Sequence, residues 1–307
     1  MNNPNKKRLR RTMMFLNAQK PGLIKDPYIY KPDSIMLDLE DAVAENQKDA
    51  ARFSLYHALK TINYRGCERV VRINGLDSPY WKEDIRCSVA GGCDSIRIPK
   101  TESAQDVKLV EREIAYAEKE FGRPEGSVLI MAAVESARGV MKALDICESS
   151  ERLFGIALSG GDYTKDLQTH ITGTGIELMG ARQNLVIAAR AAGVQCFDTV
   201  YTDLDNMEGF RQDVETIHLM GFDGKSIINH LVIIHPAGII QVCISSDPLS
   251  SKQLIDQMIS VFICLTDLGD NIIRHDNLFR IQRCLYSNLI TTGKRCKEKV
   301  GFTNGIK

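Results

Sequence analysis

The chain has 307 residues, of which 44% are hydrophobic and 25% charged, an ordinary balance for a globular protein with one large core. Lysine plus arginine and aspartate plus glutamate both number 39, so no overall charge points to nucleic acid or a membrane surface as partner. No apolar run approaches the ~20 residues of a membrane span. The basic run Lys6–Arg11 is followed by no apolar signal-peptide segment, and we interpret it as a solvated arm.

The nine cysteines are odd in number, and no two of them are spaced as C-x-x-C. This pattern argues against a disulfide framework and against a structural zinc site, so we expect a reducing cytoplasm as the location. The six histidines include no H-E-x-x-H pair that would indicate a zinc enzyme.

Eight short apolar segments recur along the chain, and polar or charged residues follow each of them. They are Met13–Leu16, Ile35–Leu37, Val70–Val71, Ile96–Ile98, Val128–Val134, Ile156–Leu158, Val200–Tyr201 and the segment at Phe222. Between them lie amphipathic segments with a helical period. The clearest repeats apolar residues from Val107 to Ala117, with Ser103 as a plausible N-cap; others cover residues 51–59 and 178–189.

Strands alternating with helices predict parallel pairing with right-handed crossovers. A doubly wound sheet would show the same alternation, but no G-x-G-x-x-G follows a strand. We therefore predict an α/β protein with a (β/α)8 TIM barrel over residues 1–230. Residues 231–307 change character, with helical patterns near 254–268 and 277–289, and we predict a C-terminal helical extension or lid within the same domain.

Chemistry in a parallel barrel is carried at the carboxyl ends of its strands. Glu135 and Asp162 follow the fifth and sixth apolar segments, and two neighbouring carboxylates suit Mg²⁺, which binds a few carboxylates together with water and substrate oxygens. The alternative is that each acid caps a helix or pairs with a nearby arginine such as Arg138. Spacing alone leaves both possibilities open.

Basic residues also follow the strands. Arg72 ends the third segment, where alternation points it into the barrel mouth, and its guanidinium could hold a substrate carboxylate or stabilise an enolate. It could instead form a salt bridge to Asp38 or Glu40. Lys100 could bind an anion or form a Schiff base, and we interpret it as electrostatic or structural. Lys225 follows the eighth segment, where barrels often bind phosphate.

Three acids crowd the end of the second segment, Asp38, Glu40 and Asp41. Like charges this close raise one another's pKa unless a cation or an arginine compensates them. Glu40 or Asp41 could hydrogen-bond Arg72 or take part directly in catalysis, and we assign Asp38, Glu40, Asp41 and Lys100 a supporting role around the site.

The motifs, taken in order, resemble those of one family. They are residues 35–43, 71–74, 97–101, 132–136, 156–158 with 162–163, 175–178 with 181–182, 191–193, 197–201 and 221–226. In this order they resemble the citrate lyase beta-subunit family of the wider acyl-CoA lyase and aldolase superfamily, over about residues 8–229. That family has the (β/α)8 barrel.

The resemblance implies that Glu135 and Asp162 bind Mg²⁺ and that Arg72 binds substrate. It implies cleavage of a citryl thioester, carried on an acyl-carrier subunit or on CoA, to oxaloacetate and an acetyl thioester. The implied partners are citrate lyase alpha and gamma subunits and further copies of the chain, with no nucleic acid and no membrane. Two alternatives stay open: a stand-alone malyl- or citramalyl-CoA lyase or thioesterase, and a non-catalytic barrel scaffold within a lyase complex.

Some segments depart from the family pattern. Asn17-Ala18-Gln19 replaces a Pro-Gly turn after the first strand, and residues 170–174 lack the usual arginine. Around residues 270–276 the Gly-Lys-x-x-Asp motif of the family's C-terminal lid is missing. That lid can serve the active site of a neighbouring subunit, so the identity of the catalytic base stays open.

Overall fold

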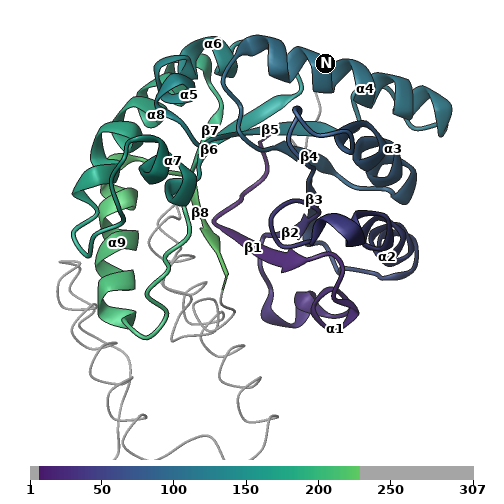
Figure 1. The fold of residues 1–307 in the computed structure, drawn as a ribbon, viewed down its shortest axis with the longest axis horizontal. Helices are drawn as coiled ribbons and strands as arrows, with labels where there is room; N and C mark the ends of the chain where they lie inside the picture. The colour runs from purple at the N-terminus through teal and green to yellow at the C-terminus, as the bar shows by residue number, and fades with distance from the viewer. Residues whose placement is uncertain (1–6, 229–307) are drawn as a thin grey trace, which may run out of the picture. The chain divides into compact units, whose positions relative to one another are not determined.

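The computed structural model describes residues 7–228, and these form a closed parallel barrel in which each strand pairs with the next and β1 pairs with β8. Figure 1 shows the strands in sequence around the barrel axis. The strands are β1 (Thr12–Asn17), β2 (Ser34–Asp38), β3 (Glu68–Arg72), β4 (Ser95–Ile98), β5 (Leu129–Val134), β6 (Leu153–Leu158), β7 (Gln195–Asp198) and β8 (Gly224–Ile227). The predicted (β/α)8 barrel is confirmed.

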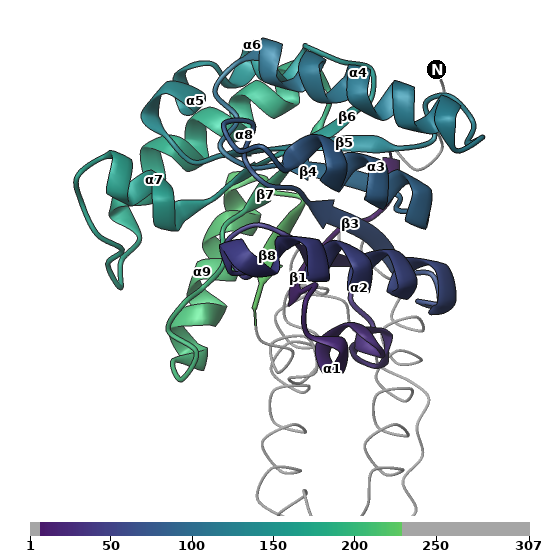
Figure 2. The same ribbon diagram turned by 45° about the vertical axis from the view of Figure 1, so that its right-hand side comes forward.

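Helices connect the strands and cover the outside of the barrel (Figures 1 and 2). The α-helices are α1 (Pro21–Ile24), α2 (Lys48–Thr61), α3 (Trp81–Gly91), α4 (Ala104–Glu120), α5 (Ala137–Met141), α6 (Ala143–Cys147), α7 (Gly160–Asp166), α8 (Met179–Ala192) and α9 (Met207–Met220). Short 3-10 helices occupy η2 (Pro27–Tyr30), η3 (Glu45–Gln47) and η4 (Ile176–Leu178).

The helix predictions agree with the structure. In α4 the Ser103 side chain accepts a hydrogen bond from the Asp106 N–H, while Asp106 accepts one from the backbone of Ser103. This capping box satisfies amide groups that would otherwise lack partners at the first turn. The helices predicted near residues 51–59 and 178–189 are α2 and α8.

The last two strands lie at positions other than those predicted. Val200–Tyr201 follows β7 instead of forming it, and Phe222 precedes β8. Hydrophobicity was misleading here because β7 begins with Gln195 and ends with Asp198, polar residues that obtain partners from elsewhere in the barrel. Polar strand ends of this kind give no apolar run to detect.

The apolar side chains form two clusters. A small one fills the barrel interior and includes Met13, Met36, Met131 and Phe197, while a much larger one lies between the strands and the helices. Alternation along each strand separates the two, because successive side chains point to opposite faces. At the carboxyl end of each strand, the side chains that point to the same face as this interior cluster line the mouth of the barrel.

A buried charge network fills the opposite end of the barrel. The Arg10 guanidinium donates to both Glu68 carboxylate oxygens at 2.7 Å and lies 3.8 Å from the centre of the Phe154 ring. Ser34 donates to the same carboxylate, and Arg11 pairs with Asp33 at 2.8 Å. The interpretation of residues 6–11 as a solvated arm is therefore wrong for its last two arginines, which the charge pattern alone could not separate from the rest.

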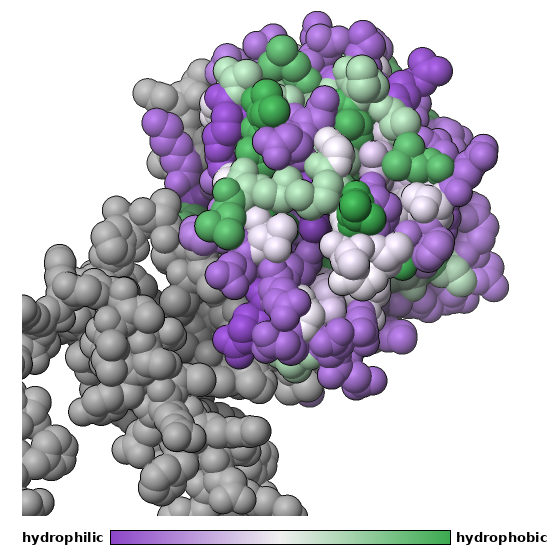
Figure 3. All heavy atoms as spheres, turned by 90° about the vertical axis from the view of Figure 1, so that its left-hand side faces the viewer, coloured by the Kyte–Doolittle hydropathy of each residue, from purple (hydrophilic) through white to green (hydrophobic). Residues whose placement is uncertain are grey.

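Among the helices of residues 7–228, none combines the length and apolar character that a membrane-spanning helix requires. The five cysteines in this part of the chain are free thiols. Figure 3 shows the side of the molecule that lies on the left in Figure 1, where hydrophobic and hydrophilic residues are interspersed. The predicted extension over 231–307, with its lid motif, lies outside the described residues.

Candidate active site at the barrel mouth

Arg72 and Asp38 form the most tightly bonded pair of the mouth. They end β3 and β2 and are register partners, so both side chains point into the barrel. The guanidinium donates through Nε and Nη2 to the two Asp38 oxygens at 2.7 and 2.6 Å. Asp38 also accepts from the Glu40 and Ala42 backbone N–H groups. This fork geometry holds Arg72 in one orientation.

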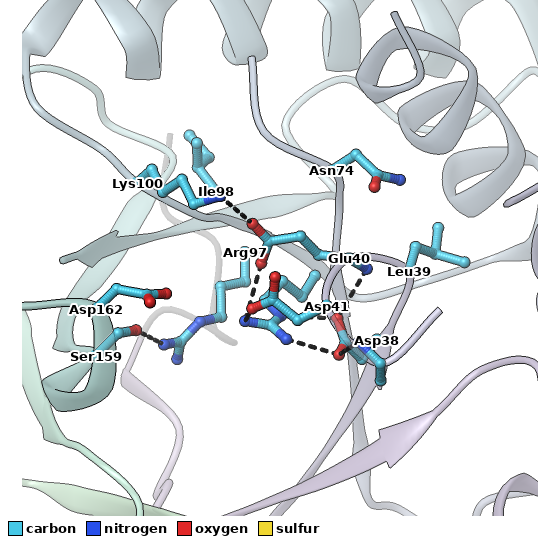
Figure 4. Close-up of polar contacts among 12 residues, drawn as sticks. Asp38, Leu39, Glu40, Asp41, Asn74, Arg97, Ile98, Lys100, Ser159 and Asp162 are labelled. Carbon is cyan, nitrogen blue, oxygen red and sulfur yellow. Dashed lines mark hydrogen bonds and ion pairs between the residues drawn. The ribbon is translucent and has the colours of Figure 1, made fainter. Parts of the chain in front are cut away.

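Glu40 lies between two cations. One of its oxygens is 2.9 Å from Arg72 Nη1, and the other is 3.3 Å from Lys100 Nζ (Figure 4). Asp41 reaches Arg72 Nη1 at 3.3 Å from a side chain that is 58% exposed. The predicted support of Arg72 by these acids is thus present as ion pairs.

The pKa values of Glu40 and Lys100 move in the same direction. Burial raises the pKa of Glu40 to about 7, with the Arg72 charge opposing and the Asp41 and Glu135 charges adding to the rise. Burial lowers the pKa of Lys100, but the neighbouring Glu40 charge outweighs it and the net pKa is raised. A Schiff-base lysine needs a lowered pKa, so the raised pKa of Lys100 supports an electrostatic role for this residue.

Glu135 lies directly after β5 and is 4% exposed. Neither of its carboxylate oxygens forms a hydrogen bond of standard geometry with any described residue. Burial raises the pKa of Glu135, and the charges of Arg97 and Arg72 oppose that rise. A buried carboxylate without hydrogen bonds is costly, which indicates a site that is completed by a ligand.

Asp162 lies in the first turn of α7, four residues after the end of β6, and accepts a hydrogen bond from Lys165 at 2.6 Å. That hydrogen bond and the Lys165 charge hold the pKa of Asp162 below its usual range despite partial burial. The Asp162 charge in turn raises the pKa of Glu135. The structure therefore brings together the two acids predicted from spacing.

These two carboxylates fit a magnesium ion. A divalent cation would offset the repulsion between the two carboxylates. The Glu135 oxygens, which form no hydrogen bond of standard geometry, are hard ligands of the kind that Mg²⁺ prefers. Within residues 7–228, no group of three or more potential ligand side chains gathers for a metal. A magnesium ion here would complete its shell with water and substrate oxygens. The alternative partner, Arg138, is exposed and lies 3.7 Å from Glu102 instead.

Two residues of the mouth were given no role from the sequence. Arg97 in β4 is 2% exposed, and its Nη2 donates to Ser159 Oγ at 2.9 Å (Figure 4). The available signal was an arginine within the buried strand Ser95–Ile98, at a position in phase with the barrel interior.

The role suggested for Lys225 is wrong. Its ammonium group is fully buried and lies 2.5 Å from Asp198 and 2.7 Å from Asp213. Arg182 bonds the same two carboxylates. These four charges compensate one another between β7, β8, α8 and α9, and the buried Lys225 ammonium is not accessible to a phosphate at the surface.

A closed parallel barrel with this set of acids and arginines at its mouth defines a (β/α)8-barrel enzyme. The family model described as HpcH/HpaI aldolase/citrate lyase matches residues 11–230. The chain belongs to this family, which places it among the carbon–carbon lyases.

Individual relatives are closely similar. The citrate lyase subunit beta of Leuconostoc mesenteroides subsp. cremoris is 52% identical over 73% of this chain and 74% of its own length. That of Escherichia coli (strain K12) is 46% identical over the same shares. A solved citrate lyase beta subunit from M. tuberculosis, in complex with oxaloacetate and magnesium, has a TM-score of 0.64. It is 25% identical and covers 78% of this chain and 99% of its own.

Proposed function

We propose that this protein is the citryl-thioester lyase subunit of a citrate lyase. It would cleave a citryl thioester to oxaloacetate and an acetyl thioester with Mg²⁺ bound by Glu135 and Asp162. The observation that carries the proposal is the buried Glu135 carboxylate, whose oxygens form no hydrogen bond of standard geometry and which lies near the charge of Asp162. The 52% identity to a citrate lyase beta subunit supports the choice of substrate.

The reaction is a retro-aldol cleavage. A base removes the proton of the tertiary hydroxyl, the C–C bond breaks as the carbonyl of oxaloacetate forms, and its electron pair moves into the thioester as an enolate. A proton on that carbon then gives the acetyl thioester. When bound, Mg²⁺ would act as a Lewis acid on the hydroxyl oxygen that becomes the carbonyl.

Arg72 would stabilise the negative charge that develops on the substrate. Asp38 holds two of its three donor directions, and Nη1 faces the mouth with the exposed Asp41 as one of its partners. Asp41 can turn into solvent when substrate enters, which would free one N–H of Nη1, while Glu40 keeps the other, for an oxygen that becomes more negative in the transition state. Asp38 would then act by fixing the guanidinium.

The test is an assay of oxaloacetate release from citryl-CoA by the full-length protein with and without Mg²⁺. We expect Mg²⁺-dependent release that Asp162→Asn abolishes. Equal activity of the wild type and Asp162→Asn would contradict the proposed site. No release from a folded sample at saturating Mg²⁺, with no release after adding an acyl-carrier subunit, would instead support a scaffold.

The partner predictions follow from the same proposal. We expect alpha and gamma citrate lyase subunits, with the citryl group on an acyl carrier or on CoA, and a homo-oligomer of this chain. The apolar side chains of Ile187 and Leu219, 60% and 81% exposed, are candidates for burial in such an assembly. The reducing cytoplasm remains the proposed location, where the free thiols of Cys93, Cys147 and Cys196 would stay reduced.

A further inference from the structure

Arg97 carries a charge into the interior of the barrel. Its guanidinium lies 5.3 Å from the centre of the Phe15 ring, with Nη1 3.5 Å from Met131 Sδ and Nη2 2.9 Å from Ser159 Oγ. Phe15 and Met131 belong to the apolar cluster inside the barrel. The one good polar partner is therefore the hydroxyl of Ser159.

Within the part of the chain that the structure describes, no carboxylate lies within ion-pair distance of Arg97, although the more distant charges of Glu135, Glu40 and Asp38 act on it. It forms no ion pair there, and its Nε has no hydrogen-bond partner. Arg72, one strand away, is bonded by Asp38, Glu40 and Asp41. The two arginines face the same Phe15 ring, at 5.2 and 5.3 Å, yet only Arg72 has its donors occupied.

Such an unpaired buried charge destabilises the fold. Burial, followed by the charge of Arg72, lowers the pKa of Arg97 to about 10, and the charges of Glu135, Glu40 and Asp38 only partly oppose this fall. The side chain therefore still carries its charge at neutral pH, without the partner that a buried ion needs. An apolar side chain of similar length would suit the neighbouring methionine and phenylalanine better, so the arginine has the character of a functional residue.

The Ser159 hydroxyl is a suitable hydrogen-bond acceptor for the Arg97 guanidinium. Ser159 follows β6, is half-buried and accepts the hydrogen bond from Arg97, because a guanidinium only donates. Its own O–H hydrogen is then left to donate elsewhere. An anion could therefore accept hydrogen bonds from the Arg97 guanidinium, including its Nε–H, and from the Ser159 hydroxyl.

We propose that Arg97 and Ser159 bind the carboxylate of the substrate's carboxymethyl arm, the group that remains as the distal carboxylate of oxaloacetate. This inference rests on the proposed function. A citryl thioester keeps two carboxylates, one on the carbon that bears the hydroxyl and one on this arm. Malyl and citramalyl thioesters carry hydrogen or methyl in place of the arm, so Arg97 would be the residue that selects a citryl group.

The experiment compares two ligands on wild type and Arg97→Met by calorimetry at saturating Mg²⁺. Fresh oxaloacetate carries the distal carboxylate, and pyruvate is the same 2-oxo acid without it. We expect the wild type to prefer oxaloacetate. Arg97→Met should weaken oxaloacetate binding by about 10- to 100-fold, the range for losing hydrogen bonds to a charged group, and change pyruvate binding less than about twofold.

Further variants separate binding from structure. Arg97→Lys should restore part of the oxaloacetate preference, and Ser159→Ala should lose part of it. The melting temperature of Arg97→Met at saturating Mg²⁺, where the ion replaces the positive charge that Arg97 supplies to Glu135, should equal or exceed that of the wild type, because a buried charge without an ion-pair partner is removed. Arg138→Met, an arginine on the exposed surface of α5, is the matched control and should leave both affinities unchanged.

Two results would overturn the proposal. Equal loss of oxaloacetate and pyruvate binding in Arg97→Met would show that the charge acts only on the magnesium site through Glu135. Absence of any preference in the wild type would show that the distal carboxylate has no partner. Neither measurement needs turnover, so a failure of lyase activity toward citryl-CoA remains distinguishable from a failure of this inference.

Discussion

Glu135 and Asp162 lie at the same mouth in different environments. Glu135 is buried without hydrogen bonds, whereas Asp162 is held ionised by Lys165. We expect either Glu135→Gln or Asp162→Asn to weaken Mg²⁺ binding by more than the ~10-fold that loss of an outer-shell group alone can cost. Calorimetric titration of Mg²⁺ in the presence of oxaloacetate measures this.

The two variants should differ in stability. Glu135→Gln removes a carboxylate whose burial outweighs the compensation from Arg97 and Arg72, so its melting temperature without Mg²⁺ should not fall below that of the wild type. Asp145→Asn, an exposed acid on α6 that pairs with Lys142, is the control and should retain Mg²⁺ affinity. Unchanged Mg²⁺ affinity in both site variants would remove the carboxylate pair as the metal site.

Titration of Glu40 should give the pH profile of the reaction rate an acidic limb. Its pKa is about 7, raised by burial and by the Asp41 and Glu135 charges against Arg72 and Lys100. The ionised form makes the ion pairs to Arg72 and Lys100, so kcat/KM should fall as pH drops below about 7 and the carboxyl of the free enzyme gains its proton.

Glu40→Gln should flatten this limb, because the amide does not titrate. The measurement is kcat/KM for citryl-CoA against pH from 5.5 to 8.5 at saturating Mg²⁺, with Glu83→Gln, an exposed acid on α3 that pairs with Arg86, as control. An unchanged limb in Glu40→Gln would assign the titration to another group.

At the residue scale, site residues could be predicted where they follow or end an apolar strand segment. Glu135 and Asp162 were identified because both follow clear apolar runs, and Arg72 because it ends one. Arg97 received no role because it lies within a strand and not after one, although alternation with Ile96 and Ile98 places it in phase with the barrel interior. Lys225 was misinterpreted because its partners, Asp198 and Asp213, come from β7 and α9 and are distant in the sequence.

At the scale of elements, local signals succeeded where the chain makes its own contacts. The capping box of α4 involves residues three positions apart, so the sequence contains all of it. β7 was placed too late because its ends are polar. Gln195 bonds Arg10, and Asp198 bonds Arg182, and neither contact is visible in a local window.

One buried acid joins α4 to the segments that precede β5 and β6 and makes a pH-dependent contribution to stability. Glu118 accepts from the Gly126 and Val128 N–H groups and pairs with Arg152 at 2.8 Å. Burial raises the pKa of Glu118, but the Arg152 bond and the two amides outweigh it, and the net pKa is lowered. A lowered pKa means that its contribution is present above the unfolded pKa of about 4.3 and is lost as pH falls further.

We therefore expect Glu118→Gln to lower the free energy of unfolding at pH 7 by about 3 kcal/mol, as when one member of a buried ion pair is removed. The deficit should shrink at pH 4, where the wild type begins to lose the same interaction. Urea denaturation at the two pH values measures both. Glu120→Gln, two residues further along α4 and more exposed, is the matched control and should be near neutral.

At the scale of the whole molecule, the barrel depends on the contact between its first and last strands. Lys225 N–H donates to the Arg11 carbonyl at 2.9 Å. A Cβ at residue 224 would lie 2.0 Å from the Arg10 carbonyl oxygen, so this position in β8 requires glycine for the close approach to the chain before β1. The alternation of strands and helices predicted closure in general, but the residues at the seam give no periodic signal.

The buried Arg10–Glu68 pair lies beside this seam and is the place to test closure. Arg10→Met leaves the Glu68 carboxylate buried without its cation, which should lower the free energy of unfolding by about 3–5 kcal/mol. The double variant Arg10→Met, Glu68→Met removes both charges and should recover part of that loss, because no unpaired ion remains. Urea denaturation of the two variants and of Lys7→Met, an exposed residue of the same basic run, measures the effect. If Arg10→Met were no less stable than Lys7→Met, the pair would not stabilise the closed barrel, and the seam would depend on backbone pairing and on Gly224 alone.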